Sequence, residues 1–248
     1  MFTLPRILAG LVVSVLIVAG AAAAAWWFFI REDAQLATSA PAIPTDLARS
    51  PAASTTAGTA TTPLAPGTLA FRILSDRSEA AYFAGEKLAS LPVPSTAKGA
   101  TKDIEGVFYL RPDGTLDPAH ASTFTVNLKT LKSDKDMRDS RVQNQALQTG
   151  QFPTATFVAK SVTGWDTSLP EGTEQDLKLT GTMDLHGVQK DITWDVKARK
   201  QGDIITALAT VSFLYSDFNI PVLNIAGFVS VEDDVTLQVQ VVAQAQTT

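Results

Sequence analysis

The chain has 248 residues, of which 45% are hydrophobic, and a formal net charge of −5. A nucleic-acid surface needs clustered Lys and Arg to displace counterions from phosphate; this acidic chain has no basic run, so nucleic acid is excluded as a partner. The absence of cysteine excludes disulfides, thiolate catalysis, iron–sulfur clusters and thiolate zinc sites.

The N-terminal stretch from Ile7 to Ile30 contains no charged residue. As a helix it would be about 36 Å long, enough to cross the roughly 30 Å hydrocarbon core of a bilayer with some tilt. Residues 1–6, with Arg6, are expected to stay in the cytoplasm. Because the charges of residues 31–33 nearly cancel, the positive-inside rule places the rest of the chain outside the cytoplasm.

A cleaved signal peptide is the alternative interpretation of this stretch, with its cleavage site among residues 21–25. The apolar run is longer than the hydrophobic region of a signal peptide. The aromatic residues at positions 26–29 are typical of a membrane interface. Both features favour an uncleaved anchor.

Residues 31–66 are rich in Ala, Thr, Ser and Pro and contain no aromatic residue. Such a segment buries too little apolar surface to offset the entropy lost on ordering. We therefore expect a disordered tether that holds the domain formed by residues 67–248 near the membrane.

From Gly67 onwards, apolar and polar residues alternate in short runs, which is typical of an all-β domain. The clearest run has Phe124, Val126 and Leu128 on one face. The same alternation predicts strands near residues 71–73, 78–84, 104–110, 155–159, 177–185, 192–198, 205–213 and 235–241. The stretch from Gly85 to Asp103, which is interrupted by proline and glycine, is predicted to be a loop.

About eight or nine strands that share one apolar face need partners for their edges. Closure into an antiparallel barrel removes the edges, and eight strands enclose space for packed side chains or for one ligand. A sandwich of two sheets is the alternative, and the periodicity does not decide between them.

A short charged helix is predicted to begin at Ser133, which stands with Asp136 in the spacing of a capping box. It ends at Gly150, and Phe152-Pro153 then leads into the next strand, because proline cannot extend a helix.

This order of elements resembles the YceI-like family, whose members carry an Arg-Asp pair followed by a Phe/Tyr-Pro-x-x-x-Phe element. The matching positions here are Arg138, Asp139, Phe152, Pro153 and Phe157. The hairpin sequence LTGTMDLHGVQK at residues 179–190 carries a second part of the resemblance. Together these parts extend over residues 68–243. The resemblance implies a lipocalin-like antiparallel barrel whose apolar interior takes an isoprenoid or another long-chain lipid, with no further cofactor.

Six residues on the inferred inner face are candidates for contact with such a lipid. They are Phe108, Phe124, Phe157, Met183, Trp194 and Phe213. Their alternative role is to fill a solid core, since protein interiors are normally close-packed.

Lys132, Arg138 and Arg141, in or beside the charged helix, are candidates for binding a polar head group at the mouth of the barrel. The alternative is a solvated helix face on which Arg138 and Asp139 form local ion pairs that position the helix.

His186 is expected to have a structural role in its hairpin turn, where a ring nitrogen can bond the local backbone. With two histidines and no cysteine, the chain is predicted to hold no metal ion. No nucleophile and base are recognisable in a catalytic pattern, so the chain is not predicted to be an enzyme.

These features predict a single-pass membrane protein whose extracytoplasmic barrel sequesters or carries an isoprenoid or fatty-acyl lipid. A solid-barrel adaptor of the cell envelope is the main alternative, and a lipid-modifying enzyme is a lesser one. If the signal were cleaved, the protein would be secreted. The sequence does not identify a protein partner.

Overall fold

The computed structural model describes residues 34–47, 63–88, 95–225 and 229–246. The expected membrane-spanning stretch, the residues before it and the middle of the expected tether lie outside these ranges, so those predictions stay predictions. Within the described ranges, no helix is both long enough and apolar enough to cross a bilayer.

The described chain folds mainly into β-strands. The strands are β1 (Leu69–Ile73), β2 (Glu79–Leu88), β3 (Ser95–Thr101), β4 (Ile104–Leu110), β5 (Ser122–Asn127), β6 (Thr154–Thr163), β7 (Gln175–Leu185), β8 (Val188–Gln201), β9 (Ile204–Leu214), β10 (Asn224–Ile225) and β11 (Val229–Ala245). The helical segments are η2 (Ser75–Arg77), η3 (Leu128–Thr130), α2 (Asp136–Arg141), η4 (Val142–Ala146) and η5 (Tyr215–Phe218).

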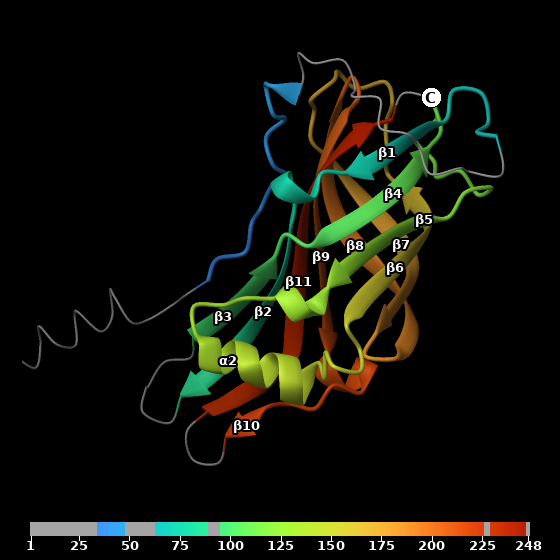
Figure 1. Cartoon of the computed structure of the whole chain (residues 1–248). Helices are drawn as coiled ribbons and strands as arrows, with labels where there is room; N and C mark the ends of the chain where they lie inside the picture. Colours follow the sequence, from blue (N-terminus) through green and yellow to red (C-terminus); the bar gives the residue numbers. More distant parts are fainter. Residues whose placement is uncertain (1–33, 48–62, 89–94, 226–228, 247–248) are drawn as a thin grey trace, which may run out of the picture.

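Eight of these strands close into a ring in which each neighbouring pair is antiparallel (Figure 1). Their order is β1-β4-β5-β6-β7-β8-β9-β11, and β11 pairs with β1 to complete the ring. With 17 residues, β11 is long enough to pair with β9 along one edge and with both β1 and β2 along the other. The barrel prediction is confirmed, and the sandwich alternative does not hold.

The β2–β3 hairpin extends the wall of the barrel at the end where α2 lies. β2 continues to Leu88, and β3 pairs with it over residues 95–101. The backbone groups of Ala100 and Lys132 exchange two hydrogen bonds of 2.8 and 2.9 Å, which join β3 to the chain before α2. The prediction of a loop is therefore wrong for residues 85–88 and 95–101, because strand pairing imposes an extended backbone there, and residues 89–94 lie outside the described ranges.

Residues 34–47, here called the N-terminal strap, lie along the outside of the barrel (Figure 1). The side-chain amide of Gln238 pairs with both backbone groups of Ala37, at 2.9 Å each. The backbone N–H of Ala40 donates to Glu174 at 2.9 Å. This part of the chain thus differs from the expected disordered tether, because polar side chains of the barrel pair with its backbone.

The short helix α2 starts differently from the prediction. Its N-cap residue is Lys135, whose side chain forms no capping hydrogen bond. Instead, Asp139 accepts hydrogen bonds from the backbone N–H and the hydroxyl of Ser133, at 2.8 and 2.7 Å. The capping box between Ser133 and Asp136 is therefore a wrong prediction, although Ser133 does help to hold the start of the helix.

The β7–β8 hairpin turns through His186 and Gly187, whose φ angles are 54° and 74°. Two positive φ angles are typical of a type I′ turn, which suits glycine at the second position. The ring of Phe152 occupies the space beside Gly187, 2.8 Å from where a Cβ would lie, and contacts the His186 ring in a tilted arrangement with the ring centroids 4.5 Å apart. The aromatic-proline element and the hairpin, far apart in the sequence, therefore form one contact.

An aromatic row crosses the inside of the barrel. Its ring centroids lie 5.2 Å apart from Phe71 to Phe108, 6.0 Å from Phe108 to Phe124, 6.2 Å from Phe124 to Phe157 and 6.0 Å from Phe157 to Trp194. Each such pair contributes about 0.5–1.5 kcal/mol beyond its area burial. The row connects β1, β4, β5, β6 and β8, so its last contact passes over β7.

Gly181 on β7 makes that last contact possible. A Cβ at Gly181 would lie 2.6 Å from Cζ of Phe157 and 2.3 Å from the carbonyl oxygen of Val158. Only a residue without a side chain leaves room for the Phe157 ring to reach Trp194 at this point.

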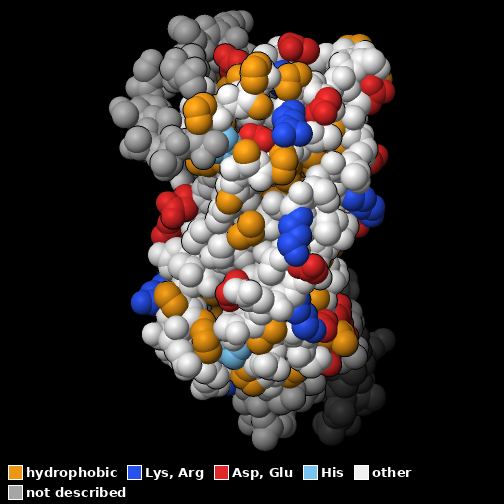
Figure 2. Space-filling model, turned by 90° about the vertical axis from the view of Figure 1, so that its right-hand side faces the viewer, with side chains coloured by type: hydrophobic (Ala, Val, Ile, Leu, Met, Phe, Trp, Pro, Cys, Tyr) orange, Lys and Arg blue, Asp and Glu red, His pale blue; other side chains and the backbone are white. Residues whose placement is uncertain are grey.

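The outer surface of the barrel carries ion pairs between strands, both between the neighbours β7 and β8 and from β6 across β7 to β8. Figure 2 shows Lys, Arg, Asp and Glu side chains interspersed on one face, with hydrophobic side chains in small groups between them. Cross-strand pairs on the barrel exterior include Lys160–Asp191, Lys178–Asp195 and Lys197–Asp176. Exposed pairs of this kind contribute only about 0–1 kcal/mol each, so stability comes from the interior.

Replacing Gly181 with alanine is expected to destabilise the fold by about 1–3 kcal/mol, because Phe157 must move away from Trp194 to admit the new methyl group. Chemical denaturation followed by tryptophan fluorescence measures this change in the free energy of unfolding. Gly150→Ala is the matched control, since nothing lies within 4 Å of its Cβ position, and it should change stability by less than about 0.5 kcal/mol. Equal effects of the two substitutions would contradict this account of Gly181.

Candidate functional site

The barrel encloses a cavity of about 440 Å³. Small-molecule sites typically measure about 300–1,000 Å³, so this volume suits a ligand. Its wall is formed by β4 to β9 and β11 of the ring, together with β2, β3 and α2. Met137 on α2 lines the cavity and is also 71% exposed, so the cavity reaches the surface beside α2.

All six residues predicted to face the interior line this cavity. Phe157, Met183 and Trp194 are buried in the wall, whereas Phe108, Phe124 and Phe213 keep part of their surface accessible. Inward-facing side chains with accessible surface are what a hollow interior produces. The barrel is therefore hollow, and the solid-core alternative does not describe it.

The polar groups of the cavity wall gather at the α2 end. Two of them, the hydroxyls of Tyr82 and Tyr215, were not among the predicted site residues. Burial raises the pKa of Tyr82 above its usual range and raises the pKa of Tyr215 to about 12. Both tyrosines are thus protonated at neutral pH, and each has an O–H that can donate a hydrogen bond.

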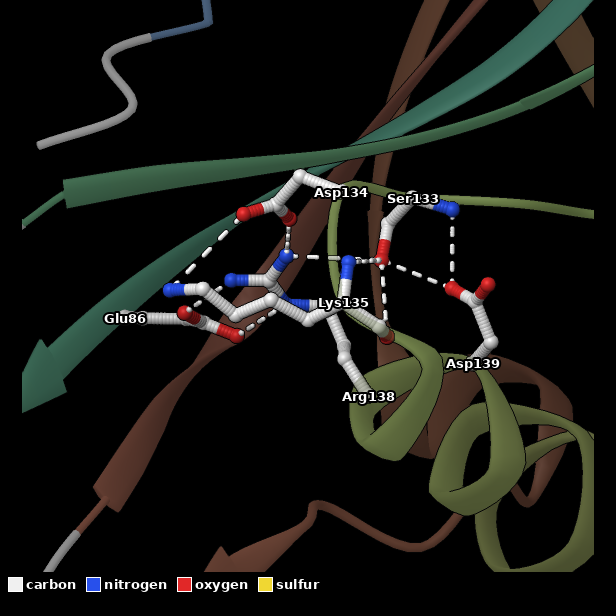
Figure 3. A network of polar contacts seen from close by, with 6 residues as sticks. All are labelled: Glu86, Ser133, Asp134, Lys135, Arg138 and Asp139. Atoms are coloured by element: carbon white, nitrogen blue, oxygen red, sulfur yellow. Dashed lines mark hydrogen bonds and ion pairs between the residues drawn. The ribbon is translucent and has the colours of Figure 1, made fainter. Parts of the chain in front are cut away.

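A polar network beside the mouth ties α2 to the barrel (Figure 3). The guanidinium of Arg138 donates two parallel hydrogen bonds of 3.0 Å to the carboxylate of Glu86 on β2, and it also bonds Asp134. The Arg138 and Glu86 side chains are only 14% and 13% exposed. Such a bidentate pair is strong and directional, so it sets the position of α2 against β2.

The electrostatics of Arg138 follow from these partners. Burial on its own lowers the pKa of Arg138, but the hydrogen bonds and charges of Glu86 and Asp134 outweigh burial and raise it above the ordinary value. Arg138 therefore stays charged and is compensated by two carboxylates. Local ion pairs are present, between Arg138 and Asp134 and between Lys132 and Asp139, but Arg138 also pairs with Glu86 from a distant strand.

The other predicted rim residues differ in position. Arg141 lines the cavity, as Arg138 does, while Lys132 does not. The Lys132 ammonium is 3.6 Å from Asp139, and its side chain is 67% exposed. Lys135, which also lines the cavity, is half exposed beside Asp134. A role for any of these residues in binding a head group stays a prediction.

Both histidines have structural contacts away from the cavity wall. The Nδ1 atom of His186 lies 3.2 Å from the carbonyl oxygen of Phe218, so it bonds a distant segment rather than the local turn. The Nδ1 atom of His120 lies 2.7 Å from Asp117, and this hydrogen bond holds the pKa of Asp117 below its usual range. Among the residues that the structure describes, no group of His, Asp and Glu side chains could hold a metal ion.

Replacing Arg138 with methionine is expected to destabilise the protein by about 1–3 kcal/mol, because the largely buried carboxylate of Glu86 loses its partner. Thermal or chemical denaturation measures the effect. Lys160→Met breaks an exposed ion pair with Asp191 and should cost less than about 1 kcal/mol, which makes it the control. If the two variants lost the same stability, Arg138 would not be what anchors α2.

Comparison with known proteins agrees with this architecture. The sequence profile of the YceI-like domain matches residues 71–243. The YceI proteins of Salmonella arizonae and Salmonella newport are each 32% identical to the chain over 106 residues, which is 42% of this chain and 50% of theirs. The chain therefore spans about half the length of these curated relatives.

Two solved structures have a similar fold. One is a polyisoprenoid-binding domain from Saccharophagus degradans implicated in plant cell wall breakdown, with a TM-score of 0.53 and 16% identity over 71% of this chain and 99% of that one. The other is BcnA of Burkholderia cenocepacia, with a TM-score of 0.51 and 19% identity over 69% of this chain and 99% of that one. The profile covers most of the chain, and the chain belongs to the YceI-like family.

Proposed function

We propose that this protein binds an isoprenoid or another long-chain lipid in its barrel and sequesters or carries it. The observation that supports this proposal most directly is the hollow interior of about 440 Å³, whose wall is apolar except at the α2 end. Binding without chemical turnover fits this wall, since both histidines have contacts outside it.

The energetics of such a ligand suit the cavity. Moving a methylene group out of water is worth about 0.8 kcal/mol, so ten carbons of a lipid chain give about 8 kcal/mol before the costs of binding. An apolar tube needs few polar contacts to hold such a chain. The two tyrosine hydroxyls at the α2 end offer hydrogen bonds to a polar head, with the lipid tail directed into the barrel.

The relatives are in keeping with a lipid ligand. The Saccharophagus degradans domain is a polyisoprenoid-binding domain with the same barrel. Its identity to this chain is low, so its ligand serves here as a guide to the class of lipid to test.

The proposal includes a location. The uncharged run at residues 7–30 anchors the chain in the membrane, and the barrel lies on the extracytoplasmic side. A lipid-binding domain held there has its ligand source within reach.

Lipid binding is tested by narrowing the cavity. Ala209→Trp places a large ring on the cavity wall, so the lipid recovered by organic extraction and mass spectrometry should fall several-fold relative to the parent chain. Thr193→Trp adds the same ring at an exposed position on β8 and should leave the recovered lipid unchanged. A parent chain that is always empty and takes up no long-chain probe would contradict the proposal.

The anchor is tested by fractionation. After expression of the full chain, the protein should stay in the membrane pellet during an alkaline carbonate wash, because an inserted helix resists extraction. Deletion of residues 1–33 should move the protein into the supernatant. Release of a shortened form from the full chain would show signal cleavage instead.

A further inference from the structure

The N-terminal strap begins beside β3, in the hairpin that extends the barrel wall at the α2 end. The backbone N–H of Ala34 donates to the carbonyl oxygen of Thr96 on β3, at 3.3 Å. Thr96 pairs in register with Gly85, and the next residue, Glu86, binds Arg138 on α2. In Figure 1 the strap starts beside β3 and runs away from α2 to the opposite end of the barrel.

The chain between the apolar run and this point is very short. Only residues 31–33 separate Ile30 from Ala34. Each residue extends a chain by at most about 3.6 Å. The four residue-to-residue intervals from Ile30 to Ala34 therefore span no more than about 14 Å in any conformation.

The strap is attached to the barrel along its length. Beyond the Gln238 and Glu174 contacts, Arg199 donates to the carbonyl oxygen of Ala40 at 3.2 Å. Near its end, Asp46 pairs with Arg77 at 2.5 Å. While the strap is docked, the barrel therefore cannot move away from the start of the strap as it could on a free tether.

The opposite end of the barrel is much farther from that starting point. β8 has 14 residues and follows the long direction of the wall, which corresponds to about 46 Å along the strand. The loop between β6 and β7, which contains Leu169, lies at this far end, because β6 begins and β7 ends on the α2 side.

The surface around the mouth combines an apolar tip with mixed charges. Met137 is exposed at the mouth, and Lys132, Lys135 and Arg141 lie on or beside the same helix. The acidic run at residues 232–234 follows Val231, which pairs with Glu86 at this end. Because both signs of charge are present, contact with a lipid surface here does not depend on anionic lipids.

We propose that the docked strap holds the α2 end of the barrel, with the mouth of the cavity, against the surface of the bilayer that anchors the chain. This inference rests on the membrane anchor of the proposed function. Its partner is the lipid bilayer itself, and lipid passes between bilayer and cavity at the Met137 side without crossing bulk water.

The test uses the full chain reconstituted in phosphatidylcholine vesicles. Because the chain has no cysteine, Met137→Cys and Leu169→Cys each accept a single fluorescent label, at two exposed apolar positions at opposite ends of the barrel. A nitroxide on the lipid head group should quench the label at position 137 strongly and the label at position 169 weakly. Adding phosphatidylglycerol should not change this difference.

A variant of the N-terminal strap tests whether docking of the strap is what orients the barrel on the membrane. Ala37→Pro removes the N–H that bonds Gln238 and should reduce the difference in quenching between the two positions, whereas Ala37→Ser keeps that N–H and should preserve it. Equal quenching at both positions in floated vesicles would overturn the orientation alone. A chain that does not float with the vesicles would overturn the anchor as well, while lipid extraction reports on the cavity independently.

Discussion

The cavity depends on one constraint, which is that a closed antiparallel ring turns every second side chain inward. Whether the interior is solid or hollow then depends on the size of those side chains. β5, which contributes Phe124 to the aromatic row, stands opposite β9 in the ring order. The inward residues of β9 include Ala207 and Ala209. The β2–β3 hairpin, which pairs with β11, contributes Ala84 and Ala97. The methyl groups at these four positions leave space that larger residues would fill, although Phe213 at the end of β9 also lines the cavity.

The sequence motifs of the family maintain this frame more than they contact the cavity. Phe152 packs on the His186-Gly187 turn, and Arg138 joins α2 to β2. Arg138, Phe157 and Met183 also line the cavity, and Phe157 depends on Gly181 for its place in the aromatic row. A signature of this kind indicates the fold reliably, because most of its residues hold elements together. It says less about which lipid the wall selects.

The strands with clear alternation could be predicted from the sequence. The runs at 155–159, 177–185, 192–198, 205–213 and 235–241 all fall within observed strands. β3 and the last residues of β2 could not, because β3 reads STAKGAT and carries no large apolar residue that would show a period of two. Its extended form comes from pairing with β2 and with Lys132, which are contacts between distant segments. The N-terminal strap is similar, since Gln238 that binds it is 201 residues away from Ala37.

The error over β2 also explains what was missed at the site. With residues 85–103 predicted to be a loop, Glu86 has no predicted place on the inner face, and Arg138 is predicted to bind a head group or to form a local ion pair on a charged helix. In the structure the two side chains compensate each other, as Lys132 and Asp139 do at a longer distance. The charges at the mouth thus act mainly on one another and on the position of α2. If the cavity takes a lipid, as proposed, the free energy of binding must then come chiefly from the apolar wall, whose residues lie in the strands that the alternating pattern predicts.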